Sequence, residues 1–288
     1  MTKNGPGYLL QRSLLYVCMI VLLFFIFAPL YWLFVSSIST RSELLNTPPH
    51  WIPEAPTLQN YLDILAPTES ASRASTDFRF ALGNSVLVSS IVTAISLVAG
   101  SLAAYAFARL RFPFRQTGLY IYLSVRMLPA ISLVIPLYII LRDASLLNST
   151  TALILVYLSF VLPFVIYIMV SFFQSIPHEL EDAARVDGCS RFGVLWRVIL
   201  PISAPGLVAA GAFAFLLAWD EFFYALLFTS TPIAKTVPVA LAEFTGRNAT
   251  DYPAQSAAAI LALIPPVVLV LIFQRFIVSG LTSGAVKG

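Results

Sequence analysis

The chain has 288 residues, of which 59% are hydrophobic and only 11% are charged, and its formal net charge is +3. A soluble domain usually carries about 25% charged residues, so this deficit predicts a polytopic membrane protein. The apolar runs described below lead us to expect an all-α fold. The charge is small and no cluster of Lys and Arg indicates binding to nucleic acid.

Residues that could carry chemistry are few. The two cysteines, Cys18 in an apolar run and Cys189 in a polar segment, are expected in different layers and are not expected to form a disulfide. They are too few, without histidines nearby, for a metal site. No GxxxxGK[ST] phosphate loop occurs, so the chain is not expected to bind ATP in that way. We therefore expect no catalytic residue, cofactor or metal in this chain.

The first apolar run, about Ser13 to Ser39, is long enough to span a bilayer, which takes about 20 residues. It has a basic start like a signal peptide, but it is too long and lacks a small-residue cleavage site. We therefore expect residues 1–39 to be an amino-terminal segment with an uncleaved helix. Residues 40–81 form the longest polar segment, with a short helical pattern at 58–65. This external loop is either a docking surface or a passive cap.

Five further apolar runs complete a predicted set of six transmembrane helices. They are expected at about 82–107, 117–141, 151–173, 206–228 and 255–278. The run 82–107 is rich in small residues around Gly100, which lets helix backbones approach closely. Prolines within these runs predict kinks and, in the last run, a break: Pro129, Pro136, Pro163, Pro265 and Pro266. Residues 82–278 form the expected five-helix core, and 279–288 form a tail.

The distribution of Lys and Arg predicts the orientation, because loops on the cytoplasmic side carry an excess of them. Six spans place ten of these residues on the side of both termini and only six on the other side, in much longer loops. Both termini are therefore expected in the cytoplasm. Asn148 and Asn248 lie in N-x-[ST] sequons on the outer side and are interpreted as chance matches.

Residues 175–205 form a polar island between two spans, on the expected cytoplasmic side. Pro177 suits the first turn of a helix, and the acidic residues after it complement the positive end of the helix dipole. Gly188 is expected to end this helix in the left-handed conformation. A second helix at about 190–198 is expected to stop at Pro201, where the chain turns back into the membrane.

This arrangement resembles the EAA motif of the permeases of ATP-binding cassette (ABC) importers. That motif reads Glu-Ala-Ala, three residues, Gly, nine residues, and Ile-x-Leu-Pro. The matching positions here, with Asp in place of Glu and Val in place of Ile, are Asp182, Ala183, Ala184, Gly188, Val198, Leu200 and Pro201. Asp187, which precedes the glycine, also matches.

The resemblance covers nearly the whole chain and looks like the carbohydrate-uptake branch, similar to the shorter permease of maltose- and trehalose-type importers. It rests further on Tyr105 to Arg109 with the following Phe112-Pro113, on Trp219 to Phe222, and on the closing residues 280–288. It implies a type I ABC importer permease with the MetI-like fold, located in the inner membrane of a bacterial or archaeal cell.

In that family the polar island is the coupling helix, which sits in a cleft of a cytoplasmic ATPase subunit. The resemblance therefore implies ATPase-coupling roles for Glu181, Asp182, Ala183, Ala184, Asp187, Gly188, Leu200 and Pro201. It also implies a second permease subunit, two ATPase subunits that bind ATP and Mg, and an external solute-binding protein. The alternative reading is an amphipathic helix on lipid headgroups, but an anionic leaflet would repel its four acidic residues.

Ionisable residues inside membrane spans are candidates for function. Three occur here, Arg126, Asp220 and Glu221, and the aromatic rings of Trp219 and Tyr224 could stack on a sugar. These five residues are the candidates for the substrate pathway. The alternative is a buried ion pair between Arg126 and Asp220 that fixes the helix bundle, with Glu221 facing water near the outer surface.

The sequence thus predicts the transmembrane subunit of an ATP-driven, binding-protein-dependent importer for a disaccharide or oligosaccharide such as trehalose or an α-glucoside. Glycerol-3-phosphate or a related polyol is the alternative cargo. An ion-coupled secondary carrier would show acidic residues in several spans and an inverted repeat, and a membrane scaffold would not need a charged cluster within its spans. Which sugar is carried cannot be read from the sequence.

Overall fold

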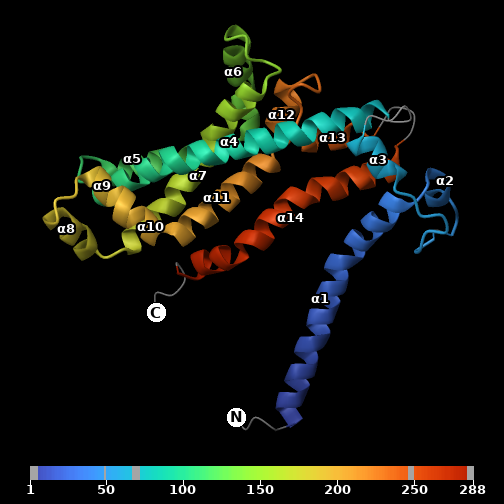
Figure 1. Ribbon diagram of the computed structural model, residues 1–288, viewed down its shortest axis with the longest axis horizontal. Helices are drawn as coiled ribbons and strands as arrows, with labels where there is room; N and C mark the ends of the chain where they lie inside the picture. Colours follow the sequence, from blue (N-terminus) through green and yellow to red (C-terminus); the bar gives the residue numbers. More distant parts are fainter. Residues whose placement is uncertain (1–5, 49, 67–71, 246–249, 284–288) are drawn as a thin grey trace. The chain divides into compact units, whose positions relative to one another are not determined.

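The computed structural model describes residues 6–48, 50–66, 72–245 and 250–283 (Figure 1). The described chain is helical, apart from one isolated bridge between Thr245 and Thr250. It divides into two compact units, Met1–Thr76 with Glu243–Leu261, and Asp77–Ala242 with Ala262–Gly288. Two long helices, α4 (Arg73–Arg109) and α14 (Tyr252–Ser283), contribute residues to both units.

The first unit contains the long helix α1 (Pro6–Ile38) and two short helices, α2 (Arg41–Leu44) and α3 (Gln59–Leu65). The short helix predicted at 58–65 is therefore confirmed. The side-chain amide of Asn60 donates to the backbone oxygens of Ser37 and Ser39, at 2.9 and 3.2 Å. These hydrogen bonds hold α3 against the end of α1. The apolar stretch of α1 is not buried within the chain.

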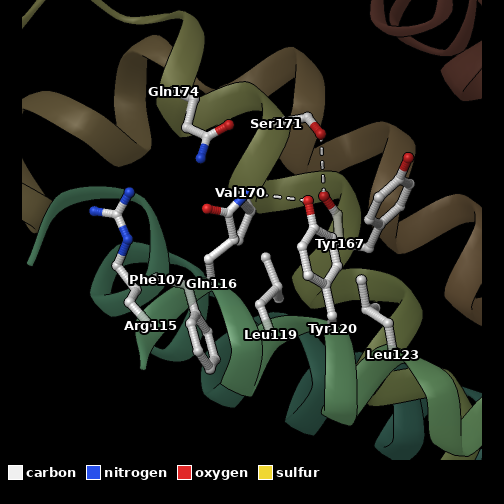
Figure 2. A pocket seen from close by; sticks show the side chains of 10 residues that line it. All are labelled: Phe107, Arg115, Gln116, Leu119, Tyr120, Leu123, Tyr167, Val170, Ser171 and Gln174. Carbon is white, nitrogen blue, oxygen red and sulfur yellow. Dashed lines mark hydrogen bonds between the residues drawn. The ribbon is translucent and has the colours of Figure 1, made fainter. Parts of the chain in front are cut away.

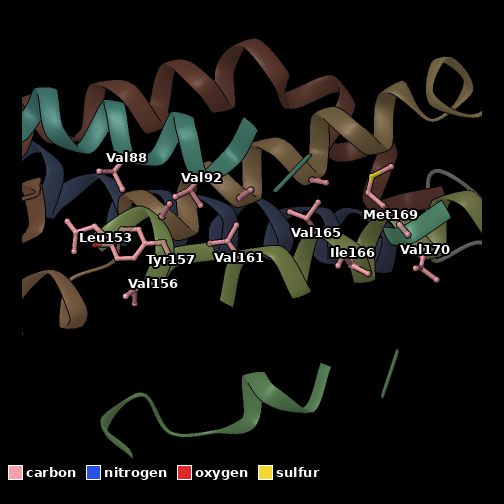
Figure 3. Close-up of a cluster of buried hydrophobic side chains, with 14 of the residues drawn as sticks. Val88, Val92, Leu153, Val156, Tyr157, Val161, Val165, Ile166, Met169 and Val170 are labelled. Carbon is pink, nitrogen blue, oxygen red and sulfur yellow. The ribbon is translucent and has the colours of Figure 1, made fainter. Parts of the chain in front are cut away.

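The core of the second unit is built around α7 (Thr150–Ser175), which packs against α4 and α11 (Ala204–Trp219). Figure 3 shows valines of α4 facing a row of apolar side chains from α7. At Gly100 of α4 a Cβ atom would lie only 2.8 Å from Val165 Cγ1 of α7. The predicted close approach at this small-residue stretch is therefore confirmed.

The predicted span 117–141 is not one straight helix. It consists of α5 (Arg115–Ser124), a 3-10 turn (Val125–Met127) and α6 (Ala130–Asp143), and the two parts are bent by 93°. Leu128, which precedes Pro129, has extended backbone angles of −68° and 127°. A residue before proline is disfavoured in the helical region, so this dipeptide breaks the helix where only a kink was expected. Pro136 lies within α6.

The polar island consists of α8 (His178–Val186), α9 (Arg191–Val194), a π-helical turn (Leu195–Ile199) and α10 (Leu200–Ile202). The prediction that Pro201 stops the second helix is wrong. Pro201 lies in the first turn of α10, where the missing N–H is tolerated. The helix ends at Ser203, where the chain bends by 80° into α11.

Three other boundaries differ from the prediction. The loop predicted at 40–81 overlaps α4, which already begins at Arg73. The span predicted at 206–228 is interrupted after Trp219 and resumes as the short helix α12 (Phe223–Phe228). The break predicted at Pro265 and Pro266 is absent, because α14 runs through both prolines. Prolines are tolerated in transmembrane helices when neighbouring groups satisfy the freed carbonyls.

The remaining segment between the spans includes the helix α13 (Val237–Ala242). The tail expected at 279–288 is helical as far as Ser283, and its last five residues lie outside the described part. Within the described ranges, four helices are long and apolar enough to cross a membrane, and the number reaches six if each of two bent pairs forms one span. This agrees with the predicted all-α fold of six spans.

Candidate functional site

Residues 178–202 lie together at one end of the second unit, which we call the α8 end (Figure 1). Pro177 precedes α8 as its N-cap, with an extended ψ of 139°, rather than lying in the first turn. Glu179 and Glu181 follow in that first turn, where negative charge is stabilised by the helix dipole. The sequence therefore places the start of α8 within one residue.

The turn between α8 and α9 depends on Gly188, which has a φ of +87°. Its N–H donates to the Arg185 carbonyl at 3.1 Å, and the N–H of Cys189 donates to the Ala184 carbonyl at 2.9 Å. Ser190 then caps α9 by accepting the N–H of Gly193 at 3.1 Å. These bonds satisfy the helix ends and confirm the predicted left-handed glycine.

The coupling candidates of α8 divide into two faces. Asp182, Ala183 and Asp187 are exposed, and the structure gives neither aspartate an ion-pair partner among the described residues. Ala184 is half-buried and packs against the core of the unit. In α10, Leu200 packs against the same core while Pro201 is exposed.

Glu181 points inward, toward the end of α4. Its Oε1 lies 2.6 Å from Nε of Arg109, and the side chains of Glu181 and Arg109 are only 11% and 2% exposed. The neighbouring residue Asp182 is therefore the acid of the motif that remains accessible. Sequence reasoning missed this role of Arg109, which it had used only for topology and for the family resemblance.

An exposed aromatic pair extends the surface of α8 onto α9 and the π-helical turn. The rings of Phe192 and Trp196 stack with centroids 6.4 Å apart and an interplanar angle of 13°. Leu195 and Ile199, on the opposite side of the same helical stretch, are buried. We call the exposed apolar and charged residues of this segment the coupling surface, and they include Leu180, Asp182, Ala183, Arg185, Val186, Asp187, Arg191, Phe192, Trp196 and Arg197. Neither aromatic residue was among the coupling residues predicted from the sequence.

The five candidates for the substrate pathway do not form one exposed site in this conformation. Arg126 is exposed in the 3-10 turn and lies over the ring of Phe164, with its Cζ 5.0 Å from the ring centroid. Asp220 is exposed at the end of α11. The structure gives no ion pair between Arg126 and Asp220 within the described ranges.

Glu221 and the two aromatic candidates serve the packing of the second unit. The two carboxylate oxygens of Glu221 accept the N–H groups of Tyr224 and Ala225, at 2.8 and 3.1 Å, and so cap α12. Trp219 is only 3% exposed, and Tyr224 is buried between Phe160 and Phe228. In this conformation neither ring is accessible to a sugar.

A pocket of about 270 Å³ opens between α5 and α7. Figure 2 shows its polar side chains, among them Arg115 and Gln116 from α5 and Gln174 from α7, around an apolar floor that includes Leu119 and Val170. None of the five pathway candidates lines it. No group of three or more His, Cys, Asp or Glu in the described part of the chain could hold a metal ion.

The fold, with four to six candidate membrane-spanning helices in its described part, is that of a polytopic membrane protein. Residues 96–283 match the model of the family described as binding-protein-dependent transport system inner membrane component. The chain belongs to this family, and it is therefore a multi-pass membrane protein that serves as a transport subunit.

Curated relatives agree along most of their length. The chain is 42% identical over 260 residues to the sulfoquinovosyl glycerol transport system permease protein of Agrobacterium fabrum, covering 90% of this chain and 88% of the relative. It is 42% identical to the trehalose transport system permease protein of Mycobacterium tuberculosis, and the match covers 90% of this chain and 92% of that relative. It is 36% identical to the trehalose/maltose transport system permease protein of Thermococcus litoralis, covering 97% and 98%.

The fold is also similar to that of a chain in the crystal structure of a bacterial ABC transporter involved in the import of the acidic polysaccharide alginate. The TM-score is 0.80, the sequence identity is 18%, and the match covers 94% of this chain and 98% of that chain. At this identity the match supports the ABC importer permease fold alone.

Proposed function

We propose that the chain is one permease subunit of an ATP-driven, binding-protein-dependent importer of a disaccharide or small glycoside. It works beside a second permease subunit, two ATPase subunits that bind ATP and Mg, and an external solute-binding protein. The coupling surface lies in the cytoplasm, with both chain termini, and contacts an ATPase subunit. Membership of the binding-protein-dependent transport family supports this assignment.

The observation that carries the proposal is the chemistry of the coupling surface. Val186 is 88% exposed and Trp196 is 65% exposed, although both side chains are apolar and lie in a polar segment. Clustered exposed apolar side chains rimmed by polar ones mark surfaces for protein partners. The exposed carboxylates of Asp182 and Asp187 alternate along the segment with the exposed side chains of Arg185, Arg191 and Arg197, so the apolar patch is rimmed by charges of both signs. A soluble protein whose cleft has an apolar floor and charged groups of both signs at its rim would complement this surface.

The relatives favour a glycoside as cargo. Their names give trehalose, trehalose/maltose and sulfoquinovosyl glycerol as what they transport. All three contain a glycosidic sugar, so we propose a trehalose-like or α-glucoside cargo. A glycerol-containing cargo is the second candidate, because one of the relatives with 42% identity transports a glycerol glycoside. Asp220 and Arg126 are the charged side chains that we propose to line the pathway.

Co-purification tests the assembly. The chain, extracted in mild detergent from its own cells, should bring down an ATPase subunit and a second permease. The variant Gly188→Pro should insert normally but lose the ATPase and sugar uptake, because proline cannot adopt the positive φ of this turn. An unaltered chain that brings down no ATPase subunit would refute the assignment. Binding of radiolabelled sugars to the cognate external protein then identifies the cargo.

A further inference from the structure

The position of α8 depends on a charged side chain from another helix. Of the nine residues of α8, only Glu181 is buried. Val186 and Leu180, the long apolar residues of the helix, are exposed. A helix in a folded protein is normally held by an apolar face, but the apolar contact of α8 with the core is limited to the half-buried Ala184. Its contacts with the rest of the unit through Glu181 therefore carry unusual weight.

Arg109, the last residue of α4, gathers three groups from the segment that contains α8. Its Nη2 donates to the Ile176 carbonyl at 2.6 Å, and its Nη1 lies 3.0 and 3.1 Å from the two ring nitrogens of His178. Its Nε lies 2.6 Å from Oε1 of Glu181. One guanidinium thus holds a backbone oxygen before α8, the first residue of α8 and its one buried carboxylate. We call this set the Arg109 clamp.

The clamp requires arginine rather than positive charge alone. A guanidinium presents its donors in a rigid, planar fork, whereas the ammonium of lysine is a single point. Lysine could therefore reach one of the three partners but not all of them. The pair of Arg109 and Glu181 within the clamp is also buried, and removing one partner of a buried pair leaves an uncompensated charge, which is strongly destabilising. Arg111 provides a contrast, because it lies in the same basic stretch but is exposed.

We propose that Arg109 is a positioning residue that fixes α8 to the end of α4, so that a displacement of α8 by its ATPase partner moves α4 with it. This proposal rests on the proposed function. From α4 the displacement reaches α7 through tightly packed contacts such as that between Gly100 and Val165. Glu181 and Asp182 then have separate roles. Glu181 ties α8 to its own chain, and Asp182 faces the partner.

Hydrogen exchange of the complete chain in detergent tests the clamp without any partner. In Arg109→Gln, the amides of residues 178–187 should exchange about tenfold faster or more, because local opening sets their protection. The same amides should be unchanged in Arg111→Gln, and those of α7 should be unchanged in both. Equal exchange of residues 178–187 in Arg109→Gln and the unaltered chain would overturn the proposal.

Conservative and paired changes separate the clamp from general damage. The amides of residues 178–187 should exchange more slowly in Glu181→Asp than in Glu181→Gln, because aspartate keeps a negative charge to pair with Arg109. In the double variant Arg109→Gln with Glu181→Gln, the same amides should exchange more slowly than the summed effects of the two single variants predict. The reason is that the double variant leaves no unpaired buried charge. Strictly additive effects would count against a direct pairing.

The assembled transporter tests the mechanical role. In proteoliposomes, the transporter with Arg109→Lys should still contain the ATPase subunits, because the coupling surface is intact. Its ATPase subunits should, however, hydrolyse several times more ATP for each sugar molecule imported. Arg111→Lys should keep the ratio of the unaltered protein. An unchanged ratio in Arg109→Lys would refute transmission through the clamp. If the unaltered chain bound no ATPase, the proposed function would fail, while the exchange experiment would still decide whether the clamp positions α8.

Discussion

Gly188 combines a positive φ of +87° with open space, since no atom lies within 4 Å of the position of a Cβ atom. Only backbone strain therefore opposes a side chain there, and it costs roughly 1–2 kcal/mol for most residues but less for Asn. We expect Gly188→Val to reduce sugar uptake and ATPase co-purification severalfold, and Gly188→Asn to reduce them only slightly. Equal losses in the two variants would show that side-chain size, not the backbone, matters at this position.

Asn148 ties the start of α7 to the loop after α12. Its Oδ1 accepts the N–H groups of Ser230 and Thr231 at 2.9 and 3.0 Å, and its Nδ2 donates to Thr231 Oγ1 at 2.8 Å. The amide that the sequon offers for glycosylation is thus engaged within the chain, which is consistent with a chance match. Asn248, in the other sequon, lies outside the described residues.

Loss of this side chain should destabilise the protein. We expect Asn148→Gly to lower the free energy of unfolding by about 1–3 kcal/mol, because three hydrogen bonds of its side chain to Ser230 and Thr231 are lost. Glycine tolerates the positive φ of 56° at this position, so the effect isolates the hydrogen bonds. Asn148→Asp keeps the Oδ1 acceptor and should cost less. Thermal unfolding in detergent measures both, and an unaffected Asn148→Gly variant would contradict the expectation.

At single residues, the sequence predicted the conformation correctly where a local rule determines it. It failed where a residue distant in the sequence determines the direction of a side chain. Gly188 was identified because the end of a helix demands a left-handed residue. The opposite directions of Glu181 and Asp182 were not foreseen, because adjacent acids look equivalent in a helical pattern until the partner is known. That partner, Arg109, lies on another helix far along the chain.

At the scale of elements, the sequence predicted the helices but not all their bends. Long apolar runs located α4, α7 and α14 because length and hydropathy suffice for that. The effect of the prolines could not be predicted, because whether a proline breaks a helix depends on packing neighbours that the local sequence does not show. Pro129 ends a helix after an extended Leu128, whereas Pro265 and Pro266 lie inside a continuous helix. The interruption after Trp219 contains no proline and gave no signal.

The packing of α4 on α7 gives a prediction for an element. Gly100→Ala should destabilise the protein by about 1–3 kcal/mol, because its Cβ would lie 2.8 Å from Val165 Cγ1 and overpack the core. The double variant with Val165→Ala should recover part of this loss, because it removes the clashing methyl group.

Gly83 supplies the matched control in the same helix, since nothing lies within 4 Å of its Cβ position. Gly83→Ala should be neutral or stabilising by about 0.5–1 kcal/mol, as alanine is the better helix former. Denaturation in detergent compares the three variants. If Gly100→Ala behaved like Gly83→Ala, the close contact between the helices would be refuted.

For the whole molecule, Cys189 reports the proposed orientation. It lies half-buried between α8 and α9, whereas Cys18 lies in the apolar stretch of α1. In a Cys18→Ser background, a membrane-impermeant thiol reagent should label inside-out vesicles but not intact cells. The variant Cys189→Ser should abolish labelling. Labelling of Cys189 in intact cells would contradict the proposed orientation and place the α8 end outside the cell.

Trp196 gives the molecule an intrinsic optical probe. Its ring is 65% exposed and stacked on Phe192, while Trp219 is buried. The emission of an indole in water lies at longer wavelength than that of an indole covered by protein, so an ATPase partner that covers the pair should shift the spectrum to the blue. Comparison with Trp196→Phe isolates this signal from the other three tryptophans. Nucleotide-driven movement at the α8 end could then be followed in real time, without any attached label.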